Sequence, residues 1–195
     1  MKDNVTPGSY SGIQITFRHA LSSIRFKVGT KENCSDADLE INVTKIEVNN
    51  VANTGDFAET LTDSPNSKTR TPAWSKQTGT VSYIPFEGNQ KVTLDGTTRT
   101  EPTGIKDLLL LPQDFTSNDN AVVKVTYTMK TKASDGIAAT EEFKLNSPSE
   151  IKKWEPNKRY TYNILFGTGE GGLQKIYFAP VVEDWKDVDN IELPL

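Results

Sequence analysis

Cysteine and histidine are nearly absent from this chain, whose 195 residues contain one of each, Cys34 and His19. A single cysteine excludes a disulfide within the chain. One histidine and one cysteine also cannot form a zinc site unless several carboxylates join them. Two acidic pairs, at positions 36/38 and 187/189, lack the central glycine and terminal glutamate of a calcium loop. We therefore expect no metal site.

Long apolar runs are missing too, because nowhere do about 18 apolar residues follow one another, as a membrane-spanning helix requires. The N-terminus shows no signal-peptide pattern. Cys34 lies in a polar stretch, KENCSDAD, whereas a lipid-anchored cysteine follows a short apolar segment. We therefore expect no transmembrane segment. If the protein is exported, we expect this sequence to be a mature or trimmed form without its signal and lipid anchor.

Charge of one sign is not in excess. The 22 basic and 26 acidic residues are interspersed and leave a net charge of −4. A nucleic-acid-binding protein normally gathers positive charge on one face, so we expect no nucleic-acid partner. A local basic cluster of Lys152, Lys153, Lys158 and Arg159 flanks Trp154 and is typical of a solvated loop.

Signatures of catalysis are missing as well. The sequence has no G-x-S-x-G nucleophile motif, and His19 lies between two short apolar runs, where a structural imidazole at a strand break is the simpler interpretation. Residues 167–172, GTGEGG, match G-x-G-x-x-G, but a dinucleotide site needs a helix next. The following segment, LQKIYFAPVVEDW, is typical of a strand, so we interpret the glycines as a hairpin connection. We expect a protein that binds no cofactor and is not an enzyme.

Apolar residues at every second position are what this sequence has in abundance. This period of two is typical of strands with one face in a core and the other in water. One run changes parity between Val43 and Ile46, which predicts a β-bulge near residues 44–45. Residues 108–111, LLLL, predict a strand that is buried on both faces. The alternating runs are Ile13/Ile15/Phe17, Ile24/Phe26/Val28, Leu39/Ile41/Val43, Ile46/Val48, Val123/Val125/Tyr127/Met129 and Tyr160/Tyr162/Ile164/Phe166.

The segments between these runs are rich in Gly, Asn, Asp, Ser, Thr and Pro, which form turns. Few segments have an apolar period of 3.6, although a short helical turn could start at Ser147. We therefore predict an all-β protein, an antiparallel β-sandwich of transthyretin-like or immunoglobulin-like type with about seven to ten strands. No composition break marks a boundary, so we expect one domain over residues 1–195. Residues 60–80 are mostly polar, and we interpret them as an exposed excursion between strands that carries Trp74.

Four motifs in a fixed order resemble the fimbrillin-like family of Bacteroidetes surface proteins. They are FRHALSSIRFKV at residues 17–28, LLLLPQ at 108–113, WEPNKRYTYNILF at 154–166 and IYFAPVVEDW at 176–185. Members of this family have two β-sandwich domains behind a lipoprotein signal, and the HALSS-type motif usually opens the second. The resemblance therefore implies a C-terminal domain of a longer precursor, or a member without the N-terminal domain.

The resemblance also implies assembly of subunits by strand donation, in which a C-terminal segment of one subunit inserts into a groove of the next. The C-terminal part of this chain suits that role, because residues 186–195 form a polar hinge followed by an alternating apolar end. A tail that closes its own sandwich is the equally good alternative. The candidate assembly residues are Ile176, Phe178, Ile191, Leu193 and Leu195.

Our leading hypothesis is a non-enzymatic fimbrial or adhesin subunit domain, exported to the cell surface or outer membrane, whose partners are other fimbrial subunits and a host or glycan ligand. The alternative is a carbohydrate-binding surface module that uses an exposed aromatic residue, with Trp74 as the candidate glycan contact. A hydrolase accessory domain is the least favoured of the three, because no pair of acidic residues has a plausible catalytic setting.

Overall fold

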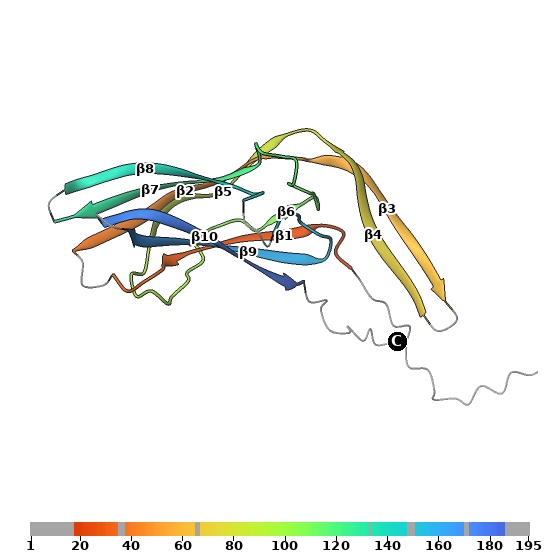
Figure 1. The fold of residues 1–195 in the computed structure, drawn as a ribbon, viewed down its shortest axis with the longest axis horizontal. Coiled ribbons are helices and arrows are strands. Elements are labelled where there is room, and N and C mark those ends of the chain that lie inside the picture. Colours follow the sequence, from red (N-terminus) through yellow and green to blue (C-terminus); the bar gives the residue numbers. More distant parts are fainter. Residues whose placement is uncertain are drawn as a thin grey trace, which may run out of the picture.

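The computed structural model describes residues 18–34, 38–64, 67–132, 134–147, 151–169 and 172–185. These residues form ten β-strands, and none of them is helical (Figure 1). The all-β prediction and the predicted range of strand numbers are confirmed, whereas the helical turn predicted after Ser147 falls outside the described residues. The strands are β1 (Ser22–Thr30), β2 (Leu39–Val51), β3 (Thr54–Ser64), β4 (Ser67–Thr78), β5 (Val81–Lys91), β6 (Leu108–Leu110), β7 (Val122–Thr131), β8 (Ser134–Lys144), β9 (Lys158–Gly169) and β10 (Gly172–Asp184).

Eight of these strands form two four-stranded sheets that face each other as a sandwich (Figure 1). One sheet has the order β10-β9-β1-β6, and the other has the order β5-β2-β7-β8. Most neighbours are antiparallel, but β1 pairs with β9 in parallel, with residues 23–30 beside residues 159–166. The strands β2 to β8 all lie between these two partners in the sequence. The predicted sandwich is thus confirmed, with one parallel pair inside it.

The alternating runs fill the space between the sheets. Ile24, Phe26 and Val28 of β1 are fully buried, and so are Ile41, Val43, Ile46 and Val48 of β2. On the facing strands, Val123 and Val125 of β7 and Ile164 of β9 are fully buried as well. A period of two brings every second side chain to one face of a sheet, so each run supplies one row of the core. The largest buried side chains of the described residues are Trp154, Tyr160, Tyr162, Phe26, Phe115 and Phe166.

A β-bulge interrupts β2 where the sequence changes its apolar parity. The register of β2 shifts between Val43 and Lys45 against both of its neighbours, β5 and β7. The extra residue turns Ile46 and Val48 back toward the core, because without it they would point to the solvent face. The predicted bulge is confirmed.

The polar ends of two aromatic residues meet inside the core. The Trp154 indole N–H donates a hydrogen bond of 2.7 Å to the Tyr162 hydroxyl, and Phe115 packs edge-on against the Trp154 ring at 4.7 Å. The Tyr160 hydroxyl accepts a 2.8 Å hydrogen bond from the Glu155 main-chain N–H. Burial raises the pKa of Tyr160 to about 12, and burial also raises the pKa of Tyr162. These side chains fasten the segment before β9 to the core.

The leucine run at residues 108–111 is not buried on both faces. Its strand β6 has three residues and lies at the edge of its sheet beside β1. Leu110 points into the core, but Leu109 is 53% exposed. The prediction from the continuous apolar run was therefore wrong, since an edge strand on the outside of a sandwich keeps one face in water.

Strands β3 and β4 form a separate two-stranded hairpin that projects from one end of the sandwich (Figure 1). The described residues of the predicted excursion at residues 60–80 are mostly exposed, but they are largely strand rather than a loop between strands. Alternation of apolar residues did not reveal it, because few apolar residues, such as Phe57, Leu61 and Trp74, stand among many threonine and charged residues. The division of the chain into domains stays a prediction.

Candidate assembly site

The sandwich ends on one side in two long edge strands, β8 and β10. Within the described residues, β8 pairs with β7 alone and β10 with β9 alone. The two edges are neighbours across the sandwich, because Phe143 of β8 stacks on Phe178 of β10 with ring centroids 5.0 Å apart. An edge strand offers main-chain N–H and C=O groups to an added strand. We call this side of the molecule the β8–β10 seam.

Apolar side chains line the β8–β10 seam. The Phe178 ring also stacks on the buried Tyr162 ring at 4.7 Å, which continues the aromatic row inward. Val182 lies opposite the buried Tyr160 in the β9–β10 pairing, yet it is 42% exposed. A hollow of about 300 Å³ opens beside this row, lined by Glu142, Phe143, Lys144, Ser147 and Phe178. The seam therefore combines exposed apolar surface with open strand edges.

Both ends of the described chain meet at one clamp. The His19 ring stacks on the Trp185 ring, with centroids 3.5 Å apart and planes within 8°. Asn157 links them through two hydrogen bonds. Its side-chain Oδ1 accepts from the His19 main-chain N–H at 3.3 Å, and its main-chain carbonyl accepts from the Trp185 main-chain N–H at 3.0 Å. Asn157 has a φ of 59°, a left-handed conformation that asparagine tolerates better than most residues. Residues 1–17 and 186–195 are therefore joined to the sandwich at neighbouring points.

The structure tests the placement of some of the predicted assembly residues but not their role. Ile176 and Phe178 lie in β10 and pack against the core. As part of an antiparallel pair with β9, they close the sandwich of their own chain. Ile191, Leu193 and Leu195 fall outside the described residues. Their role as donor residues stays a prediction.

Trp74 lies in β4 and is only partly exposed. Its indole N–H donates a 2.7 Å hydrogen bond to the Ala20 carbonyl, and its ring packs at 5.2 Å against Phe57 of β3. The polar group that could contact a sugar is therefore already used within the chain. A glycan contact at Trp74 stays a prediction.

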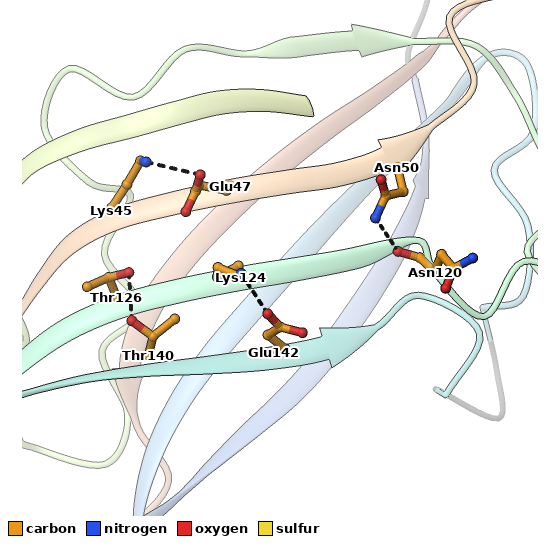
Figure 2. A network of polar contacts seen from close by, with 8 residues as sticks. All are labelled: Lys45, Glu47, Asn50, Asn120, Lys124, Thr126, Thr140 and Glu142. Atoms are coloured by element: carbon orange, nitrogen blue, oxygen red, sulfur yellow. Dashed lines mark hydrogen bonds and ion pairs between the residues drawn. The ribbon is translucent and has the colours of Figure 1, made fainter. Parts of the chain in front are cut away.

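The outer face of the second sheet is polar, and its charges are paired. Figure 2 shows Lys45 with Glu47 at 3.0 Å and Lys124 with Glu142 at 2.6 Å. The hydrogen bond from Glu142 raises the pKa of Lys124. Thr126 and Thr140 share a 3.1 Å hydrogen bond on the same face. Such a self-satisfied polar face is typical of a solvated surface.

Two residues of the basic cluster at residues 152–159 are also paired with acidic groups. Lys153 lies 2.7 Å from Glu155, and Lys158 pairs with Asp184. Among the residues that the structure describes, no three His, Cys, Asp or Glu side chains gather as a metal site would require. None of the described segments forms an apolar helix long enough to cross a bilayer.

Sequence reasoning missed two features of this region. The first is the clamp, because Trp185 and His19 are distant in sequence and only the fold brings them together. The second is the β3–β4 hairpin, whose signal is a threonine-rich sequence and not an apolar period. The E-P-N-K sequence before β9 is a turn signal that could have pointed to Asn157.

Two solved structures of bacterial proteins are similar to this chain. Similar solved structures include a candidate cell adhesion protein from Bacteroides uniformis, with 16% identity and a TM-score of 0.37 over 87% of this chain and 52% of that one. Another, also a candidate cell adhesion protein, comes from Bacteroides eggerthii, with 12% identity and a TM-score of 0.44 over 86% of this chain and 56% of that one. This chain thus spans about half the length of those proteins.

No curated protein matches the chain. The model of a protein family described as fimbrillin-like, by contrast, matches residues 2–185. That match includes every described strand and extends over nearly the whole chain. The protein therefore belongs to the fimbrillin-like family.

Proposed function

We propose that this chain is a non-enzymatic domain of a fimbrial or adhesin subunit, which is exported to the surface of a Bacteroidetes cell and joins other subunits by β-strand addition. Membership of the fimbrillin-like family supports association with other subunits at the cell surface. The observation that carries strand addition is the β8–β10 seam, where two long strand edges lie together beside exposed apolar side chains.

Strand addition joins two chains through main-chain hydrogen bonds, while alternate side chains of the added strand fill pockets. In our proposal the donor is the tail at residues 186–195, with Ile191, Leu193 and Leu195 on one face. The tail follows Trp185, which the clamp holds at the end of β10. The apolar end at residues 191–195 is shorter than β8 and β10, which have 11 and 13 residues, so either edge is long enough to accept it.

The test is a titration with a synthetic peptide of residues 185–195. It would be added both to the full chain and to a chain that ends at Trp185. We expect saturable binding to both chains, because a donated strand must be accepted by an intact subunit. Binding to the shortened chain alone would show that the tail closes its own sandwich and would contradict donation between subunits. No binding to either chain would also contradict the proposal.

Two neighbouring valines of β10 provide a matched control for the acceptor. Val182 lies on the face of the buried Tyr160, whereas Val181 lies opposite Thr161 on the outer face. The two are similarly exposed, at 42% and 46%. We expect Val182→Lys to weaken peptide binding about tenfold or more, since it brings a charge into the apolar seam, and Val181→Lys to leave it unchanged. Equal effects of the two changes would exclude the seam as acceptor.

A further inference from the structure

The β3–β4 hairpin is separate from the two four-stranded sheets. In the described part of the chain its strands of 11 and 12 residues pair with each other and with no third strand. An isolated two-stranded hairpin is marginally stable in water and usually packs against another element. The question is therefore which segment covers this hairpin.

The two faces of the hairpin differ in chemistry. The register places Phe57 opposite Trp74, Glu59 opposite Pro72 and Leu61 opposite Arg70, so these six side chains share one face. The other face carries Ala58 with Ala73 and Thr60 with Thr71. We call the first of these the hairpin face. On it Leu61 is 49% exposed, and Arg70 pairs with Glu59 at 3.1 Å. Asp63, opposite Lys68 in the register, follows on the same face toward the tip of the hairpin.

The described chain begins in contact with this hairpin. The Ala20 carbonyl accepts the Trp74 indole N–H at 2.7 Å, and the Arg18 guanidinium donates to the Arg70 carbonyl at 3.0 Å. Going backward from residue 20 to residue 18, the contacts move from Trp74 to Arg70, which is toward the tip of the hairpin. A segment that continued this path before Arg18 would run along β4, toward Ser67.

We propose that residues 13–17, IQITF, bind along the hairpin face of their own chain, with Ile15 and Phe17 on Leu61 and Pro72. The segment has apolar residues at every second position and no charge, so it suits the stretch of the face where Leu61 and Pro72 flank the joined pair of Arg70 and Glu59. Five extended residues span about 16 Å. The five residue steps of β4 from Pro72 to Ser67 cover the same length. The inference does not depend on strand donation.

A disulfide test distinguishes the two faces of the hairpin. Both variants would be full chains in which Cys34→Ala removes the native thiol. The test variant would carry Ile15→Cys together with Leu61→Cys. The control variant would carry Ile15→Cys together with Thr60→Cys. Leu61 and Thr60 are neighbours on opposite faces. At low protein concentration under mild oxidation, we expect the first pair to form an intramolecular disulfide at least about ten times faster than the control. Equal rates, or cross-linking mainly between two chains, would overturn the proposal.

Hydrogen exchange of the full chain gives a second, independent readout. We expect Ile15→Asp to speed amide exchange in β3 and β4 about tenfold or more, while amides in β2 and β7 keep their protection. The matched control is Gln14→Asp, which places the same charge on the opposite face of the segment. Equal effects of the two changes would refute the proposal. A loss of protection caused by Leu193→Asp and not by Ile15→Asp would make the C-terminal tail the occupant and would overturn it as well.

Discussion

The buried hydrogen bond between Trp154 and Tyr162 offers a sharp test of what holds this sandwich together. The indole N–H donates to the hydroxyl at 2.7 Å, and the two residues are 2% and 1% exposed. In Tyr162→Phe the ring and its packing against Phe26 remain, since the two centroids are 5.7 Å apart in the native protein. The change therefore isolates the loss of one hydroxyl.

The magnitude follows from the environment of the indole group. A typical hydrogen bond contributes about 1 kcal/mol, whereas a buried donor left without a partner costs about 1–3 kcal/mol. Water cannot easily replace the hydroxyl, because the neighbouring Phe115 and Tyr160 rings are also buried. We expect Tyr162→Phe to lower the free energy of unfolding by about 2 kcal/mol.

Urea unfolding followed by circular dichroism measures this difference by linear extrapolation. Tyr127→Phe is the matched control: Tyr127 is 7% exposed, its ring packs edge-on against Phe166, and within the described residues its hydroxyl has no protein hydrogen-bond partner. We expect a loss below about 0.5 kcal/mol for that change. In a Trp154→Phe background the donor is gone, so Tyr162→Phe should cost clearly less than in the native chain. Equal losses in Tyr162→Phe and Tyr127→Phe, or in both backgrounds, would refute the reasoning.

Three further predictions concern pH, the clamp and glycan binding. Burial raises the pKa of Tyr160 from its usual 10 to about 12, so the folded protein keeps the hydroxyl proton to higher pH than the unfolded chain. This difference stabilises the fold fully below pH 10. We expect urea titrations to show the free energy of unfolding falling between pH 10 and pH 12. Trp185→Ala removes the stack on His19, which is worth about 0.5–1.5 kcal/mol; hydrogen exchange should quicken at the end of β10 and not in β2, and a uniform increase would contradict a local clamp. If Trp74 contacts glycans, Trp74→Ala should abolish retention on a glycan array while circular dichroism stays native, and an array without signal for the unchanged chain would exclude that function.

The fold class was predictable because it depends on a local pattern. Alternating side chains in runs such as Ile24/Phe26/Val28 need a half-buried strand, and the parity change between Val43 and Ile46 needs a bulge. Both follow from the geometry of one strand and are confirmed. The prediction that the leucine run at residues 108–111 is buried on both faces was wrong, because whether a strand lies at an edge depends on its partners and not on its own residues.

The candidate site was much less predictable. The β8–β10 seam exists because β10 and β8 end their respective sheets on the same side, and sheet order is a property of long-range pairing. Likewise, no pattern within residues 54–78 shows that β3 and β4 leave the sandwich. The role of Ile191, Leu193 and Leu195 remains a prediction from the sequence.

By itself, then, the sequence determined what short-range chemistry can determine: the strand pattern, the position of the bulge and, through four ordered motifs, the fimbrillin-like family. The tertiary structure alone decided which strands are neighbours, including the parallel pairing of β1 with β9, and so which of the described strands form the sheet edges. It also brought His19 to Trp185 and Arg18 to the hairpin. The physical reason is that alternation selects which face of a strand is buried, while the partner across the sheet is selected by the packing of the whole core.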